Sequence, residues 1–168
     1  DGSDGEGKFT GAYVKEPKPG LYKWVYDLDL TSLYPSIIMS INISPETKIG
    51  KLKGYSAEQH MKGNLETYSI IDDGGNEFPP LPKEKFLKFI EKNKYSVAAN
   101  GVLYRTDKVG VIPEILSVWF DKRVEYKNLM KKYGKEGNDE QYKFYGKRQL
   151  VQKIMLNSLY GVLGLPSF

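Results

Sequence analysis

The chain has 168 residues, enough for one domain of ordinary size or for two small lobes. It contains no cysteine, which excludes a disulfide framework and cysteine-ligated zinc, and no run of roughly 18 apolar residues that would predict a membrane span. The net charge is +4, and residues 114–153 account for all of it, with ten basic and six acidic side chains. This excess fits an anionic partner, but on charge alone a solvated helical surface is slightly favoured.

The first 28 residues predict a loose end followed by a strand. The opening, DGSDGEG, is acidic and glycine-rich, so we expect a flexible end or a cut site there. No signal peptide is recognised, which together with the lack of cysteine fits a cytoplasmic location. Residues 21–29 are rich in Tyr, Trp and Val and predict a β-strand.

Short elements are predicted between residues 35 and 104. Pro35 suits the first turn of a short helix that ends near residue 41. Residues 42–80 carry many turn signals and say little about function, and no role is assigned to His60. Apolar residues at helical spacing predict a helix over residues 82–94, and Asn100-Gly101 predicts a β-hairpin.

Two long helices are predicted next, the first over residues 113–133 and the second ending near residue 160. Between them, Asn138 and Gln141 have the spacing of a capping box. The short connection predicts an antiparallel helical hairpin. The first inner stripe would contain Ile115, Trp119, Tyr126, Leu129, Met130 and Tyr133. The second would contain Val151, Ile154, Met155 and Ser158, with Gly161 and Gly164 closing the helix.

Residues 29–36, DLTSLYPS, are the most informative stretch. Asp29 would end the predicted strand, and a polar turn, Tyr34 and a helix start follow it. A carboxylate and the next backbone carbonyl at a strand end are typical of metal and phosphate chemistry. Taken alone, such an Asp is usually a turn or cap residue, and a Tyr before Pro is usually a packing residue. Asp27 is interpreted as a structural or supporting residue.

The two predicted helices each carry a polar pair at a spacing of four residues. Arg123 and Lys127 share one face of the first helix, and Lys153 and Asn157 share one face of the second. If the helices pair, three cations and one amide can converge on one groove. A triphosphate needs such a set of fixed positive charges, with a bidentate donor such as Arg. Either pair alone would more often be a solvated surface.

These segments resemble the family B DNA polymerases. Residues 29–36 resemble motif A of that family, and residues 153–161, KIMLNSLYG, resemble its motif B of the form KxxxNSxYG. Residues 120–127 resemble the first fingers helix, and residues 8–12 resemble the template-contacting element Tyr-x-Gly-Gly/Ala, with Lys-Phe in place of the usual opening. The flanks GAYVKEP and NISPET are most similar to the replicative polymerases of large tailed phages.

The resemblance implies specific roles in two-metal nucleotidyl transfer. Asp29 would be the catalytic aspartate that binds two Mg²⁺ ions, and the Leu30 carbonyl would complete one metal shell. The remaining implied residues fall into two groups. Nucleotide binding would involve the backbone N–H groups of Ser32 and Leu33, the sugar-excluding steric gate Tyr34, and the side chains of Arg123, Lys127, Lys153 and Asn157. Base-pair or template contacts would involve Tyr160, Gly161, Gly11 and Ala12.

The family also requires a second catalytic aspartate, in a DTD motif after motif B, and no DTD occurs here. The segment between the first fingers helix and motif B is also short for the phage branch. We therefore expect the isolated chain to be inactive, with residues outside it completing the metal site. It would be a piece of a split polymerase, a piece cut from a longer protein or a gene remnant, and the first two explanations are favoured because the recognisable motif positions are intact.

The predicted fold is α/β (α+β), with a partial polymerase palm sheet and a two-helix antiparallel fingers hairpin. Residues 1–110 would be the partial palm, residues 111–161 the fingers, and residues 162–168 the start of the return to the palm. The expected partners are primer–template DNA, dNTP and the remaining polymerase segments (exonuclease, rest of the palm and thumb) or a second copy, with no membrane. If the chain is phage-encoded, its location would be the cytoplasm of the infected host. The alternative function is a non-catalytic nucleic-acid-binding or assembly module.

Overall fold

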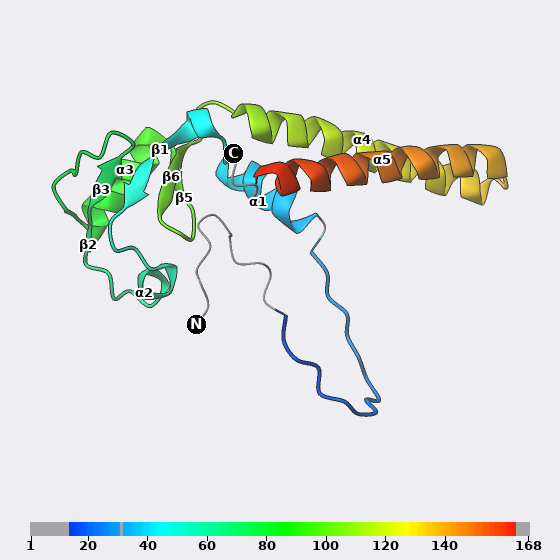
Figure 1. Cartoon of the computed structure of the whole chain (residues 1–168), viewed down its shortest axis with the longest axis horizontal. Coiled ribbons are helices and arrows are strands. Elements are labelled where there is room, and N and C mark those ends of the chain that lie inside the picture. The colour runs from blue at the N-terminus through cyan, green and yellow to red at the C-terminus, as the bar shows by residue number, and fades with distance from the viewer. Residues whose placement is uncertain (1–13, 31, 164–168) are drawn as a thin grey trace, which may run out of the picture.

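The computed structural model describes residues 14–30 and 32–163, and these form an α+β fold, as predicted. A sheet lobe (residues 45–105) and a long helical hairpin (residues 111–163) extend in opposite directions, and the short helix α1 lies against the base of the hairpin (Figure 1). No helix in the described part of the chain is long and apolar enough to cross a membrane.

Residues 14–30 form an extended segment that loops away from both lobes in Figure 1 (blue). The strand predicted over residues 21–29 is wrong, because these residues form no strand and no described strand pairs with them. Apolar and β-branched side chains favour a strand only when a neighbour takes up its hydrogen bonds and covers one face. The large apolar side chains of the segment are all exposed: Val14, Leu21, Tyr22, Trp24, Val25, Tyr26, Leu28 and Leu30.

Helix α1 (Leu33–Ile41) confirms the short helix predicted around Pro35 and begins two residues before it. Both flanking residues, Ser32 and Asn42, have left-handed backbone conformations, with φ values of 51° and 61°. Asn tolerates this conformation well, since its short polar side chain can hydrogen-bond locally. The buried face of α1 consists of Pro35 and Ile38, which fixes the helix against the hairpin.

The sheet lobe contains four antiparallel strands in the order β3-β1-β6-β5. A second, two-stranded sheet pairs β2 with β4. The strands are β1 (Lys48–Leu52), β2 (Thr67–Tyr68), β3 (Ile70–Asp72), β4 (Leu81–Pro82), β5 (Tyr95–Val97) and β6 (Val102–Arg105). The helical pieces are the 3₁₀ turn η1 (Pro45–Thr47), α2 (Ala57–Met61) and α3 (Lys83–Asn93). The predicted helix over residues 82–94 and the hairpin between β5 and β6 are thus confirmed.

The core of the sheet lobe is small and contains two stacked rings. Tyr68 and Phe86 lie with their ring centroids 4.2 Å apart, and Leu52, Ile70 and Leu103 surround them. Each of these side chains is at most 8% exposed, so the lobe has a compact apolar centre of its own. The lobe therefore provides a fixed base for the elements that leave it.

Helices α4 (Val111–Lys135) and α5 (Asp139–Leu163) form the predicted antiparallel hairpin. Asn138 starts α5 as expected, since its Oδ1 accepts a hydrogen bond from the backbone N–H of Gln141 at 3.1 Å. The rings of Tyr133 and Tyr145 stack across the two helices with centroids 5.6 Å apart. Aromatic contacts therefore hold the far end of the hairpin together.

The inner face predicted for α5 is largely wrong. Val151 and Ile154 are 53% and 56% exposed and Ser158 is exposed, whereas Leu156 is 1% exposed. Apolar residues lie on both sides of α5, so the sequence pattern does not select the side that packs. On α4, Ile115 is likewise 37% exposed, at the edge of the predicted stripe. The core at the base of the hairpin consists of Ile38, Leu116 and Leu156, with Ile112, Trp119, Phe120, Leu159 and Tyr160 packed around them.

Candidate functional site

The base of the hairpin brings together residues that are far apart in the sequence. The backbone of Ser32 starts α1, and its carbonyl accepts the first hydrogen bond of the helix from Ser36 N–H at 2.9 Å. The first backbone N–H groups of a helix have no acceptor within the helix, and here no side chain caps them. They include the N–H groups of Leu33 and Tyr34. A helix start of this kind attracts an anion.

Arg123 links the middle of α4 to this helix start. Its Nη1 donates a hydrogen bond of 3.0 Å to Ser32 Oγ, which lies 91 positions earlier in the chain. Its Nε is buried and has no hydrogen-bond partner among the residues that the structure describes. A buried guanidinium nitrogen without a partner is costly. Arg123 therefore has unused donor capacity beside the start of α1.

Two tyrosines that were assigned separate roles from the sequence are in direct contact. The rings of Tyr34 and Tyr160 stack with centroids 4.1 Å apart and an interplanar angle of 15°. Burial raises the pKa of Tyr160, and the neighbouring Tyr34 raises it further. Tyr34 remains 41% exposed, so part of the residue stays accessible beside the stack on Tyr160.

The remaining predicted nucleotide-binding side chains lie on the same two helices but make no such contact. Lys127 is half-buried on α4, and Lys153 and Asn157 are exposed on α5. None of the three forms a hydrogen bond or ion pair with another residue that the structure describes. They are therefore free to bind a ligand, but whether they converge on it stays a prediction.

The predicted metal ligands are not assembled. Asp29 and Leu30 lie exposed in the extended segment, as does Asp27. Among the described residues there is no group of three or more His, Asp or Glu side chains that could hold a metal ion. Gly11 and Ala12 lie outside the described residues. Gly161 is exposed within α5, which continues past it, so the prediction that it closes the helix is wrong.

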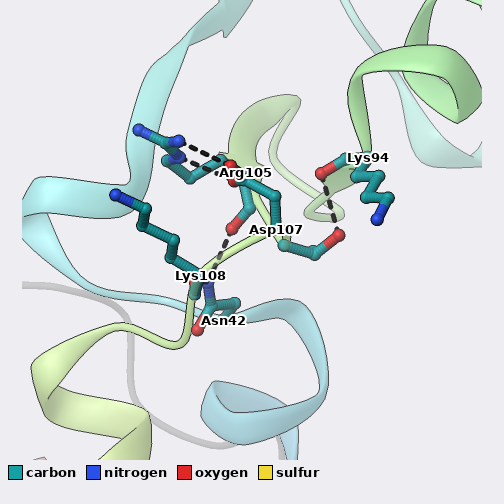
Figure 2. A network of polar contacts seen from close by, with 6 residues as sticks. Asn42, Lys94, Arg105, Asp107 and Lys108 are labelled. Atoms are coloured by element: carbon teal, nitrogen blue, oxygen red, sulfur yellow. Dashed lines mark hydrogen bonds and ion pairs between the residues drawn. The ribbon is translucent and has the colours of Figure 1, made fainter.

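Sequence reasoning missed a polar knot, defined here as Asn42, Ser44, Glu46 and Thr47 together with the backbone of residues 105–112. Asn42 Nδ2 donates to the carbonyls of Arg105 and Lys108, and its Oδ1 accepts from Gly110 N–H (part of this network is drawn in Figure 2). The only sequence signal was the NISPET string, which carried a family resemblance but no contact information.

Charge and hydrogen bonding lower the pKa of two carboxyl groups, one in this knot and one next to it. The N–H of Val111 holds the pKa of Glu46 below its usual value, and the Ser44 hydroxyl acts in the same direction. Arg105 donates to both carboxylate oxygens of Asp107, at 2.7 and 2.6 Å, and keeps the pKa of Asp107 at about 2 (Figure 2). Both groups are charged at neutral pH and accept hydrogen bonds from the segment that leads into α4.

Comparison with known proteins places the sequence of this chain in a family. A family model for DNA polymerase family B matches residues 1–167. The chain belongs to DNA polymerase family B. The resemblance of the chain to that family is therefore confirmed, and Arg123 lies within the matched residues.

Individual family B relatives support the assignment. The chain is 36% identical to the DNA-directed DNA polymerase of Escherichia phage RB69 over 122 residues, which is 73% of this chain and 11% of the relative. It is 33% identical to that of Enterobacteria phage T4 over 84% of this chain and 13% of the relative. It is 32% identical to a DNA polymerase of Pyrococcus glycovorans over 93% of this chain and 15% of the relative. The chain thus spans only a small part of these polymerases.

Proposed function

We propose that this chain supplies part of the nucleotide-binding site of a DNA-directed DNA polymerase. The observation that carries the proposal is the contact between Arg123 and Ser32, because it holds a guanidinium beside the uncapped start of α1. Both features bind phosphate oxygens, one through charge and a planar set of donors and the other through backbone N–H groups. An incoming dNTP would replace the Ser32 hydroxyl with stronger, charge-assisted bonds from Arg123.

Other residues would complete the nucleotide site. Lys127, Lys153 and Asn157 have no partners among the described residues and could close on the β- and γ-phosphates as the two helices pack around them. Tyr34 would pack under the sugar and exclude a 2′-hydroxyl by its bulk, and the stack on Tyr160 would keep its ring in place. Tyr160 and Gly161 would border the new base pair, and Gly11 and Ala12 the template.

Asp29 suits a magnesium site as one member of a larger set. Its carboxylate and the Leu30 carbonyl are hard oxygen donors of the kind that Mg²⁺ prefers, and Asp29 is accessible. The described residues supply no cluster of three acidic or histidine ligands, so further ligands would come from other parts of the polymerase. Bound Mg²⁺ would neutralise charge on the reacting phosphates. The isolated chain would therefore bind nucleotide without extending a primer.

The exposed apolar side chains of residues 14–30 favour the presence of a partner surface that covers them. Residues 14–30 present eight large apolar side chains to solvent, which is costly unless another surface covers them. We propose that another part of the polymerase covers these side chains, and that this contact also brings Asp29 close to the second catalytic carboxylate. The same proposal divides the chain into a partial palm (residues 1–110), a fingers hairpin (residues 111–161) and a return to the palm (residues 162–168). It also places the protein in the host cytoplasm.

Calorimetric titration with dATP and Mg²⁺ tests the proposed nucleotide site. Arg123→Ala should weaken binding roughly tenfold or more, as expected for one lost charge-assisted interaction. Lys131→Ala, at an exposed position further along α4, is the matched control and should bind like the parent chain. If binding responds to salt and to DNA but not to triphosphate, the chain is instead a nucleic-acid-binding module.

A further inference from the structure

The start of α4 is held by side chains from a distant segment and not by a cap of its own. Gly110 precedes the helix and provides no capping side chain. Instead, Glu46 Oε1 accepts a hydrogen bond from Val111 N–H at 2.6 Å, and Ser44 Oγ accepts one from Ile112 N–H at 3.4 Å. The donors and acceptors lie 65 and 68 positions apart in the chain. The first turn of α4 is therefore docked by tertiary contacts.

Asn42 is the centre of this docking. Its side-chain amide donates to the carbonyls of Arg105 at 2.6 Å and Lys108 at 2.8 Å, and its oxygen accepts from Gly110 N–H at 2.8 Å. The residue is 7% exposed, so these bonds are shielded from water. Three bonds from one rigid amide fix the path of the chain from β6 into α4.

The rest of the polar knot leaves little freedom around Asn42. Thr47 Oγ1 donates a hydrogen bond of 2.6 Å to the Asn42 carbonyl, and Ser44 Oγ donates one of 2.7 Å to Glu46 Oε2. Gly110 packs so closely that a Cβ atom there would lie 2.6 Å from the Cβ of Ser44. The knot is thus a tight joint between the end of α1 and the beginning of α4.

A small change in direction at this joint would displace the residues of the candidate nucleotide site that lie further along α4. Arg123 lies twelve residues beyond Val111, or about 18 Å along the helix. A tilt of α4 by about 10° at its start would move Arg123 by about 3 Å, which equals the length of a hydrogen bond. The contact between Arg123 and Ser32 at 3.0 Å therefore requires α4 to keep its direction within a narrow range. The knot fixes the start of α4, and packing against α1 and α5 supports the helix further along.

We infer that Asn42 is a positioning residue that sets the direction of α4 and thereby places Arg123 over the start of α1. Its role for nucleotide rests on the proposed function, whereas its role in helix direction does not. The side chain acts at a distance, since it touches neither Arg123 nor Ser32 through any hydrogen bond. Losing its bonds should raise the population of tilted α4 by roughly tenfold or more.

Distance measurements between two spin labels test the inference on the full chain. The sequence has no cysteine, so Lys51→Cys on β1 and Lys131→Cys on α4, both exposed, allow specific labelling. Asn42→Gly removes the amide but keeps the left-handed backbone accessible. It should broaden or shift the distance distribution, whereas the control Asn64→Gly, at an exposed position, should not.

A second pair of variants makes the test independent of any folding defect in Asn42→Gly. Glu46→Ala should also broaden the distribution, and Glu46→Gln should restore it, because an amide oxygen can still accept from Val111 N–H. Unchanged distances in Asn42→Gly, even with a lower melting temperature, would overturn the inference. If Asn42→Gly does not fold, native distances in both Glu46 variants would overturn it.

Nucleotide titration of the same variants separates this inference from the proposed function. Weaker dATP–Mg²⁺ binding by Asn42→Gly, together with changed distances, supports both. If not even the parent chain binds nucleotide, the proposed function fails, while the distances still decide whether Asn42 directs α4. Weaker binding with native distances would overturn the positioning role.

Discussion

Replacing Tyr34 and Tyr160, singly and together, should reveal a direct energetic coupling between α1 and α5. The rings stack with centroids 4.1 Å apart and an interplanar angle of 15°. An aromatic pair in contact contributes about 0.5–1.5 kcal/mol beyond its burial. We therefore expect the double variant Tyr34→Ala/Tyr160→Ala to be less destabilised than the sum of the single variants by about that amount.

Urea unfolding of the four proteins measures this coupling, and a second cycle serves as its control. Tyr133 packs on Tyr145 near the far end of the hairpin, so Tyr133→Ala and Tyr160→Ala should add within about 0.3–0.5 kcal/mol. Additivity in the Tyr34–Tyr160 cycle would refute the reasoning, because it would mean that the stack does not hold the ring of Tyr34 in solution.

The same pair makes a prediction about pH. Because the folded-state pKa of Tyr160 is raised, its contribution to stability is fully present below the ordinary value of 10.0 and is lost as the pH rises through the higher folded value. Tyr34→Ala should bring the pKa of Tyr160 down, since it removes both part of the burial and the neighbouring hydroxyl. Carbon-13 NMR of labelled tyrosine rings, assigned with Tyr160→Phe, measures the change, and an unchanged pKa would contradict the stacked geometry.

Three further changes test the joint and the core. Leu156→Ala should destabilise the chain by about 2.7–5 kcal/mol in urea unfolding, because it opens a cavity among buried side chains where α1, α4 and α5 meet. Gly110→Ala should cost about 1–3 kcal/mol by overpacking against Ser44, and a stability equal to the parent's would show that the joint is looser than described. The pKa of Glu46 is lowered in the folded chain. The parent should therefore be more stable than Glu46→Gln above the ordinary pKa of 4.5, and this difference should disappear as the pH falls through the folded-state pKa. A difference in stability that persists in acid would contradict the contact with Val111.

Local signals predicted the elements whose causes are local. Pro35 marks the first turn of α1, the Asn100-Gly101 pair makes the turn between β5 and β6, and Asn138 caps α5. Each of these features depends on backbone geometry or on a hydrogen bond within a few residues. For the same reason, the paired helices α4 and α5 could be predicted from their lengths and their short connection.

Non-local features could not be predicted in the same way. The composition of residues 21–29 is that of a strand, but no described strand pairs with them, and no local pattern could reveal that. Helix α5 has apolar residues on two sides, so the packed side, with Leu156, was set by α1 and α4 rather than by periodicity. The bonds of Asn42 span 63 to 68 positions, which no spacing rule covers.

The candidate site likewise has features that could be predicted from the sequence and contacts that could not. The types and spacings of four side chains predicted which of them could bind a triphosphate: Arg123, Lys127, Lys153 and Asn157. The role of Tyr34 at the sugar was implied by the family resemblance. The contact of Arg123 with Ser32, and that of Tyr34 with Tyr160, became visible only once three helices were placed together. The structure therefore adds a geometric reason for two of the assigned roles and leaves the metal ligands as a prediction.

Nuclear magnetic resonance titration of the nitrogen-15-labelled chain with dATP and Mg²⁺ tests the central claim most directly. The account predicts shifts at the backbone N–H groups of Leu33 and Tyr34 and at the Nε–H of Arg123, which is buried and has no partner in the described part of the chain. These shifts should disappear in Arg123→Ala and persist in Lys131→Ala. Shifts confined to the basic far end of the hairpin, with none at the start of α1, would contradict the proposed nucleotide site.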